Sequence, residues 1–470
     1  MSQLKYMKMW VTVWASISKE TILSKLINMV HVFRVNVAHK PFDDVQKKYI
    51  DTILKIDDSK TIILETKWEE VSIRNIPAIS YSVWQTMTIE YSQIHEDDES
   101  ILFVNYAFLP QMPRGTQLAF EGSSIILEVT DNDDDKATCK VIVAGTTSLG
   151  QKVTFAWYVP KLSFLSDKDK KDVIRGIHSG VNLLAASAVK TADDIVDMKR
   201  FLDSQEAHGI KVYARLHRPE AYDQIDAIIH AADGILIGSG DIAWMGWKMD
   251  EITLIQRIKS LGKPVMVCLH AALMEDTDVL RRLMHVYAAA WVDMIMVEED
   301  ITEVKAPLDP LSMIINFLIE WEQQWTQAIS WYDLSYIYNG EVDESSYLVS
   351  LLPRIIADTG ARVAICYTAG GLTSARIASL KLNIPVIVFT RNDFIYRYNN
   401  LLRGIKGYKI WQTSTYSELK QIGKEMIRIH FKGNISLDDK VIIINAIETD
   451  VDQSIDGIIN GIELYKFKSI

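Results

Sequence analysis

The chain has 470 residues, of which 48% are hydrophobic and 24% are charged. At roughly 150 residues per domain, this length predicts about three domains, and the composition excludes a disordered, collagen-like or low-complexity protein. Lys and Arg total 50 against 61 Asp and Glu, and the resulting net charge of -11 argues against nucleic acid or an anionic membrane as the main partner.

The sequence carries no signal for a membrane or for an oxidising compartment. No stretch reaches the roughly 18 to 20 unbroken apolar residues of a membrane helix, and no small-residue cleavage site follows the short apolar run at the N-terminus. The three cysteines, Cys139, Cys268 and Cys366, are odd in number and outside any CxxC pair, so neither a disulfide framework nor a cysteine-based zinc site is supported. We therefore expect a cytoplasmic protein.

Eight apolar runs typical of buried strands recur along the first 300 residues, with helix-periodic segments between most of them. Their starts lie roughly 20 to 30 residues apart, except for a gap of about 120 residues between the third and the fourth. This repeat predicts a closed (β/α)8 TIM barrel formed by residues 1–72 and 158–329, with one large insertion. The runs are MKMWVTVW near residue 8, VHVFRVNVA from Val30, TIILETK from Thr61, VNLLAASAV from Val181, IKVYARL from Ile210, GILIGSG from Gly234, PVMVCLH from Pro264 and WVDMIMV from Trp291.

The insertion and the last part of the chain differ from the repeat. Residues 73–157 contain the alternating runs TMTIEYSQI, SSIILEVT and KATCKVIVA and predict a small β-barrel lid domain. Residues 330–470 predict a separate open α/β domain, with a helix over Glu344 to Thr359, strands at ARVAICYT, IPVIVFT and KVIIINAI, and a helix from Thr373.

Function on a (β/α)8 barrel is carried at the carboxyl ends of the strands, so the residues that close each run are the candidates for a site. Cations and carboxylates are mixed there, which suits an anionic ligand held with a divalent or monovalent ion, with Asp241 as the best single metal ligand. The alternative is that these polar side chains only pair with one another. The closing residues are Arg34, Asn36, Ala38 and His39; Glu65, Thr66 and Lys67; Arg215 and His217; Ser239, Gly240 and Asp241; Cys268, Leu269 and His270; and Glu298, Glu299 and Asp300.

The chain resembles the pyruvate kinase family from end to end. The resemblance rests on six segments, which are, in order, FRVNVAH, ILETK, KDKKDVIRGIHSGV, DAIIHAADGILIGSGDIA, GKPVMV and TAGGLTSAR. The resemblance implies the same three-domain plan, with a β lid inserted after the third barrel strand. It also implies transfer of a phosphoryl group between phosphoenolpyruvate and ADP in glycolysis, with Mg²⁺, usually K⁺, and a lysine over the transferring group. The family resemblance further implies a homo-oligomer, a tetramer in the family.

Several positions that the resemblance marks as functional are retained. Arg34 matches the family's phosphate-contacting arginine, and Lys67 and Gly240 are further expected substrate contacts. Asn36, Glu65 and Thr66 occupy the positions of K⁺ ligands, although Glu65 replaces an aspartate and the neighbouring serine is Ala38. Asp241 matches one of two metal carboxylates.

Other positions depart from the family pattern. The family's KIENQEG is RLHRPEA here, which puts Arg215 at the catalytic lysine and His217 at the second Mg²⁺ carboxylate. Arginine cannot freely replace a compact ammonium, and neutral histidine is a poor ligand for Mg²⁺. Leu269 stands at the threonine associated with enolate protonation and cannot perform that role. The Gly-Pro turn that leads to the lid is replaced by Trp68 and Glu69.

Two further sites are weighed against plainer alternatives. His217 and His270 with Asp241 and Glu298 would make a new transition-metal site, but single histidines at strand ends more often only form local hydrogen bonds. The TAGGLTSAR segment resembles the family's sugar-phosphate effector loop, although its expected partner loop is DVDQSIDGIING, and an ordinary helix N-cap is the alternative. The effector-loop candidates are Thr368, Gly370, Gly371, Thr373 and Ser374.

These observations favour a divergent pyruvate kinase family protein whose phosphotransferase activity is lost or strongly reduced. We expect Mg²⁺ and K⁺ to bind weakly or not at all, and a small anion such as phosphoenolpyruvate to bind weakly. The alternatives are an active pyruvate kinase with a rebuilt metal site, and a regulatory or structural subunit that assembles with a homologue.

Overall fold

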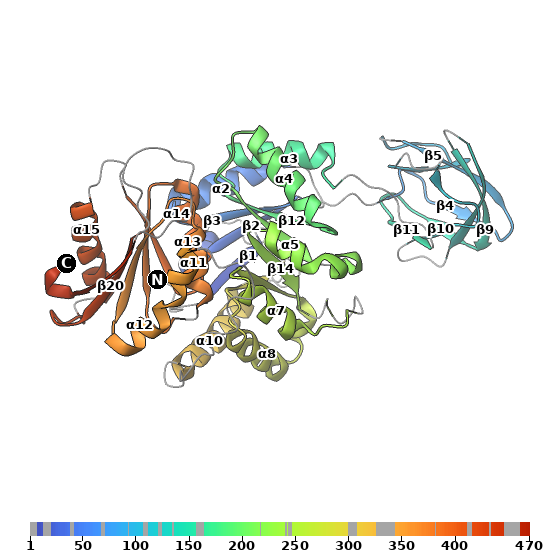
Figure 1. Ribbon diagram of the computed structural model, residues 1–470. Helices are drawn as coiled ribbons and strands as arrows, with labels where there is room; N and C mark the ends of the chain where they lie inside the picture. The colour runs from blue at the N-terminus through green and yellow to red at the C-terminus, as the bar shows by residue number, and fades with distance from the viewer. Residues whose placement is uncertain are drawn as a thin grey trace. The chain divides into compact units, whose positions relative to one another are not determined.

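A computed structural model describes most of the chain (Figure 1). It divides into two compact units, Met1–Lys67 with Asp167–Ile470, and Trp68–Ser166. The boundaries given above for three domains stay predictions. The described residues are 7–12, 20–37, 42–66, 71–92, 94–106, 111–120, 125–133, 136–156, 164–216, 218–239, 242, 247–298, 308–325, 344–380, 382–410, 416–431, 434–445 and 461–470.

The first unit contains a closed barrel of eight parallel strands, which confirms the predicted fold class. Each of the eight apolar runs found in the sequence supplies one strand, because strands that are covered on both faces read as continuous apolar segments. The order around the barrel is β1-β16-β15-β14-β13-β12-β3-β2. The strands are β1 (Lys8–Thr12), β2 (Val32–Asn36), β3 (Thr61–Glu65), β12 (Leu183–Ala186), β13 (Lys211–Leu216), β14 (Gly234–Gly238), β15 (Val265–Leu269) and β16 (Met294–Val297).

Helices alternate with these strands, and their starts are fixed by local sequence. The helix over Asp44–Ile56 begins with a capping box, in which the Asp43 side chain accepts from the Gln46 backbone and the Gln46 side chain accepts from the Asp43 backbone. The Asp276 side chain caps the helix over Thr277–Ala289 by accepting from the backbone N–H groups of Asp278 and Val279. The barrel helices are α1 (Glu20–Met29), α2 (Asp44–Ile56), α3 (Asp167–His178), α4 (Ala192–Ser204), η2 (Pro219–Gln224), α5 (Ile225–Ala231), α7 (Glu251–Ser260), η3 (Ala271–Met274), α8 (Thr277–Ala289) and α10 (Leu308–Trp325).

The second unit is the inserted β domain. A six-stranded sheet has the order β11-β7-β8-β9-β5-β6, and β10 pairs with β4 in a separate two-stranded sheet. Side chains along β9 alternate between buried and more exposed, as expected for a sheet with one face on a core. The strands are β4 (Ile79–Tyr81), β5 (Thr86–Tyr91), β6 (Ile101–Val104), β7 (Gln117–Phe120), β8 (Ile126–Asn132), β9 (Lys136–Val143), β10 (Gly145–Thr147) and β11 (Val153–Ala156).

The C-terminal part of the first unit is an open five-stranded sheet of order β19-β18-β17-β20-β21, with only the last pairing antiparallel. The single helix predicted over Glu344 to Thr359 is wrong, because the segment forms two helices. Pro353, in the first turn of the second helix, lacks the N–H that an unbroken helix would need. The elements are α11 (Glu344–Ser350), α12 (Leu352–Thr359), β17 (Val363–Tyr367), α13 (Leu372–Ser379), β18 (Val386–Thr390), α14 (Asp393–Asn399), β19 (Ile405–Lys409), α15 (Tyr416–Phe431), β20 (Lys440–Asn445), β21 (Gly461–Lys466) and η5 (Phe467–Ser469).

Within the described ranges, no helix is long and apolar enough to cross a membrane.

Candidate functional site at the carboxyl end of the barrel

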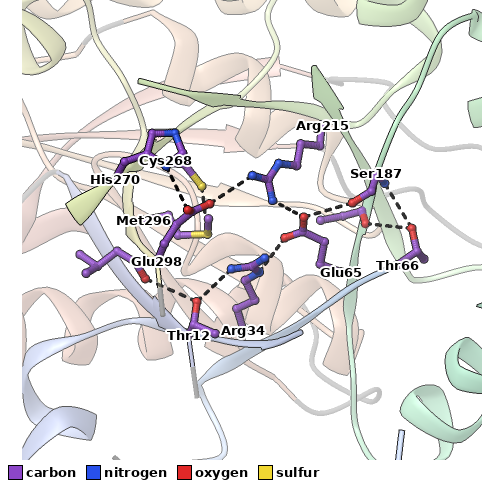
Figure 2. Close-up of polar contacts among 12 residues, drawn as sticks. Thr12, Arg34, Glu65, Thr66, Ser187, Arg215, Cys268, His270, Met296 and Glu298 are labelled. Carbon is purple, nitrogen blue, oxygen red and sulfur yellow. Dashed lines mark hydrogen bonds and ion pairs between the residues drawn. The ribbon is translucent and has the colours of Figure 1, made fainter. Parts of the chain in front are cut away.

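Four charged side chains from separate strands meet at the carboxyl end of the barrel (Figure 2). Arg34 lies on β2, Glu65 ends β3, Arg215 lies near the end of β13, and Glu298 follows β16. Parallel strands in register bring these positions together; Asn36, for example, pairs with Glu65. Arg34 and Glu65 are almost fully buried, at 2% and 3% exposed, so their charges must be compensated by the protein itself.

Glu65 is the centre of the group. Its Oε2 lies 2.6 Å from Arg34 Nε, and its Oε1 accepts from Arg215 Nη1 and, at 3.1 Å, from Ser187 Oγ. Arg34 also donates from Nη1 to Thr12 Oγ1 at 3.1 Å. Both oxygens of this carboxylate therefore face cations of the chain.

Arg215 links Glu65 to a second carboxylate. Its Nη2 donates to Glu298 Oε1 at 3.1 Å, while Glu298 Oε2 lies 3.1 Å from His270 Nδ1 (Figure 2). The planar guanidinium thus uses two of its nitrogens on two different carboxylates. His270 makes a local hydrogen bond, as expected in the alternative to a metal ligand.

The electrostatics of the group keep both carboxyls ionised. Burial is the largest influence on Glu65 and favours its neutral form, but the charges of Arg215 and Arg34 outweigh it and hold its pKa below the ordinary value. Burial likewise opposes ionisation of Glu298, yet the hydrogen bond with His270 and the charge of Arg215 lower its pKa to about 2. The pKa of Arg215 is raised, because Glu65 and other neighbours overcome the cost of its burial.

Two hydroxyl groups of the site were not singled out in the sequence. The Ser187 hydroxyl donates to Glu65, and the Thr12 hydroxyl accepts from Arg34. Thr12 ends β1, and Ser187 directly follows β12. Ser187 also donates from its backbone N–H to Thr66 Oγ1 at 3.2 Å. The rule that predicted the other members, applied to the first and fourth strands, would have found both residues.

The remaining candidates divide into buried neighbours and residues outside the described ranges. Leu269 is fully buried, Cys268 Sγ lies 3.4 Å from Met296 Sδ, and Ser239 Oγ lies 2.5 Å from the Tyr287 hydroxyl. Asn36 is buried, and its backbone carbonyl accepts from Gln46. The predictions that lie outside the described residues concern Ala38, His39, Lys67, Trp68, Glu69, His217, Gly240, Asp241, Glu299 and Asp300.

The described donor set does not fit a divalent metal ion. Mg²⁺ requires near-octahedral oxygen ligands at about 2.0–2.1 Å. The four oxygens of Glu65 and Glu298 already contact Arg34, Arg215, Ser187 and His270, so an ion could bind them only by displacing Arg215. In the part of the chain that the structure describes, no three His, Cys, Asp or Glu residues are grouped so as to hold a metal ion. The K⁺ positions at Glu65 and Thr66 are engaged in the same protein contacts.

The expected effector loop lies at the start of α13. Gly371 adopts a left-handed φ of +82° as the N-cap residue, and its N–H donates to Thr368 Oγ1 at 3.1 Å. Ser374 Oγ lies 2.7 Å from Asn399 Oδ1, and the Thr373 side chain is buried. These hydroxyls make internal contacts, as in the N-cap alternative, and the partner loop DVDQSIDGIING falls outside the described residues. The effector site, including Gly370, stays a prediction.

Comparisons with known proteins agree over most of the chain. Residues 5–277 match the family description "Pyruvate kinase, barrel domain", and residues 349–458 match "Pyruvate kinase, alpha/beta domain". A pyruvate kinase of Staphylococcus haemolyticus is 27% identical over 274 residues, which cover 55% of this chain and 46% of that protein. The chain thus spans about half the length of this relative.

Longer matches and a solved structure extend the likeness. A pyruvate kinase of Geobacillus stearothermophilus is 20% identical over 434 residues, covering 87% of this chain and 72% of the relative. A crystal structure described as a pyruvate kinase from Cryptosporidium parvum superposes with a TM-score of 0.77 at 17% identity, and covers 98% of this chain and 96% of that one. At this identity the structural likeness establishes the fold.

Proposed function

Because the chain belongs to the pyruvate kinase family, we propose that it is a divergent member in which phosphoryl transfer from phosphoenolpyruvate to ADP is lost or strongly reduced. The observation that carries this proposal is the position of Arg215 between Glu65 and Glu298. By resemblance, this is the position of the lysine that stabilises the transferring phosphoryl group. Here the cation contacts two carboxylates of the protein.

Phosphoryl transfer depends on preorganised positive charge at the transferring group. Arg34 and Arg215 are both paired with Glu65, so their fields are largely cancelled before a substrate arrives. A substrate phosphate would have to compete with a buried carboxylate for the same donors. This competition weakens substrate binding and raises the free energy of the transition state.

The sequence supports the proposal at two further positions. His217 replaces a metal carboxylate, and Leu269 replaces the threonine hydroxyl associated with enolate protonation. Any remaining ligand is expected to be a small phosphate or carboxylate, bound with an affinity of roughly 1 mM or weaker and little affected by EDTA. In this reading Mg²⁺ and K⁺ are weakly bound or absent, and the fold serves assembly, either as a homo-oligomer or with an active homologue.

The test is an assay of pyruvate formation by the purified chain with Mg²⁺, Mn²⁺ and K⁺, beside calorimetric titration with phosphoenolpyruvate. We expect activity at least about 10³-fold below that of a working kinase, a loss of roughly 4 kcal/mol of transition-state stabilisation. Turnover near 10 per second or above, or tight and strictly metal-dependent binding, would mean an active pyruvate kinase with a rebuilt metal site.

A restoration experiment tests the mechanism of the loss. Arg215→Lys, His217→Glu and Leu269→Thr made together should recover part of the activity, whereas each change alone should not, because residues that act as one unit are not additive. Arg215→Lys alone also breaks the two-carboxylate contact, since an ammonium does not offer the flat fork of a guanidinium.

A further inference from the structure

We infer that the Arg215 guanidinium takes the place of a bound cation between Glu65 and Glu298, and that removing it turns this pair of glutamates into a site for a divalent metal ion. The inference concerns the ion selectivity and stability of the barrel mouth. It goes beyond the proposed loss of turnover, and none of its tests measures pyruvate formation.

The Arg215 guanidinium bridges two carboxylates. Arg215 Nη1 donates to Glu65 Oε1 and Nη2 donates to Glu298 Oε1, so the guanidinium lies directly between two carboxylates from separate strands (Figure 2). A metal ion that bridges two carboxylates places its positive charge in the same position. The side chains of Arg215 and Glu298 are 16% exposed and that of Glu65 is 4% exposed, so solvent can supply little of the compensation.

The charges of the four paired side chains balance. Arg34 and Arg215 carry two positive charges, and Glu65 and Glu298 carry two negative charges, so these four side chains are neutral as a group. Without Arg215 the same group has a net charge of -1. Glu65 then keeps only Arg34 as an ion-pair partner in this group, and Glu298 keeps the contact with His270.

The carboxylates of Glu65 and Glu298 are suitable ligands for divalent metal ions. Carboxylate oxygens are preferred by Mn²⁺, Ca²⁺ and Mg²⁺, and Ca²⁺ in particular tolerates irregular geometry at about 2.3–2.6 Å. Among the described residues, Arg215 is the side chain that donates hydrogen bonds to both carboxylates, and its truncation removes these contacts. We therefore expect an ion to enter once the tethered cation is gone.

The experiment measures Mn²⁺ binding to the purified full chain by calorimetry and by the loss of the free-ion electron paramagnetic resonance signal. Arg215→Ala should bind Mn²⁺ at least about tenfold more tightly than the unaltered chain, and Mn²⁺ should raise its melting temperature. The matched control is Arg257→Ala, which breaks an exposed ion pair with Asp226 and should gain no site. The double variant Arg215→Ala with Glu298→Gln should lose the gain.

The inference is overturned if the unaltered chain binds Mn²⁺ as tightly as Arg215→Ala, or if the gain persists in the double variant. Arg215→Gln, which is neutral but fills more of the space, covers the case in which Arg215→Ala does not fold. A folded Arg215→Gln that binds Mn²⁺ no better than the unaltered chain also overturns it.

Chemical rescue provides an independent readout. A few millimolar methylguanidinium, added to Arg215→Ala during refolding, should raise its melting temperature and should compete with Mn²⁺. The same additive should leave the melting temperature of the unaltered chain unchanged or lower it. If neither methylguanidinium nor Mn²⁺ stabilises the variant, Arg215 does not act as a replaceable cation and the inference fails.

Discussion

Glu298 ionises more readily than an exposed glutamate although its side chain is only 16% exposed. Burial raises its pKa, but the hydrogen bond with His270 and the charges of Arg215 and Arg34 reverse that effect and lower the pKa to about 2 from an ordinary value of 4.5. A group with a depressed pKa in the folded state stabilises the fold above its unfolded pKa, and this contribution is lost as the pH falls toward the folded pKa.

The lowered pKa of Glu298 predicts that the stability of the barrel mouth is sensitive to acid. Glu298→Gln should be less stable than the unaltered chain at neutral pH, and the difference should shrink as the pH falls from about 4.5 to about 2. Urea denaturation at a series of pH values measures both curves. The matched control is Glu128→Gln, on β8 in the other unit; among the residues that the structure describes, Glu128 forms no ion pair. A difference between Glu298→Gln and the unaltered chain that stays constant with pH would contradict the assignment.

The sequence predicted which residues meet at the mouth better than it predicted what they do there. The strand-end rule identified Arg34, Glu65, Arg215 and Glu298, because parallel strands bring their carboxyl ends to one side of a barrel. It could not predict that Arg215 would reach two carboxylates, since this depends on side-chain conformations that spacing does not specify. These four residues do pair with one another, and their roles in ligand binding stay predictions. For Lys67, His217 and Asp241 the site assignment stays a prediction.

At the scale of elements, apolar runs predicted the central strands and failed at the edges of the C-terminal sheet. β17, β18 and β20 were predicted because each is covered on both faces and reads as an apolar segment. The edge strands β19, IKGYK, and β21, GIELYK, mix charged and apolar residues and gave no such signal. Edge strands commonly carry charges, because these discourage pairing with other chains.

The loop between α8 and β16 contacts the C-terminal α/β domain through hydrogen bonds. Arg403 is 2% exposed and donates from Nη1 to the carbonyls of Ala288 and Val292 at 2.9 and 3.2 Å. Its guanidinium lies 3.8 Å from the centroid of the Trp291 ring, and Trp291 Nε1 donates to the Ala378 carbonyl at 3.0 Å. One arginine therefore satisfies two buried carbonyls and packs on an aromatic ring.

Arg403→Met should lower the free energy of unfolding of the first unit by about 2 kcal/mol, because the buried Val292 carbonyl loses its Arg403 donor and the Ala288 carbonyl keeps only backbone donors. Relief of the repulsion between Arg403 and the buried Lys259 offsets part of this loss. Arg354→Met is the matched control; it removes an exposed ion pair with Asp358 in the same domain and should change stability by no more than about 0.5 kcal/mol. Urea denaturation curves compare the two, and equal small effects would show that the Arg403 contacts contribute little.

At the scale of the whole molecule, the inserted β domain has a core of its own. Every residue of its buried apolar cluster falls between Val71 and Val153, and the cluster includes Ile89, Leu127 and Val141. The unit is roughly 100 residues long, which is enough for a single domain to bury a core and fold alone. Its stability should therefore not depend on the barrel or on the C-terminal sheet.

The isolated fragment Trp68–Ser166 is accordingly expected to fold and to unfold cooperatively in urea, as followed by circular dichroism and by tryptophan fluorescence. Two isoleucine-to-aspartate substitutions test whether the buried apolar cluster stabilises the isolated fragment. Ile89 is fully buried on β5, between β6 and β9, so Ile89→Asp places a carboxylate where no water can reach it and should abolish the transition. Ile94 is 68% exposed, and Ile94→Asp should leave the midpoint within about 0.5 kcal/mol of the starting fragment. A fragment without a cooperative transition, beside a full chain that unfolds in one step, would mean that the insertion depends on the rest of the molecule for its stability.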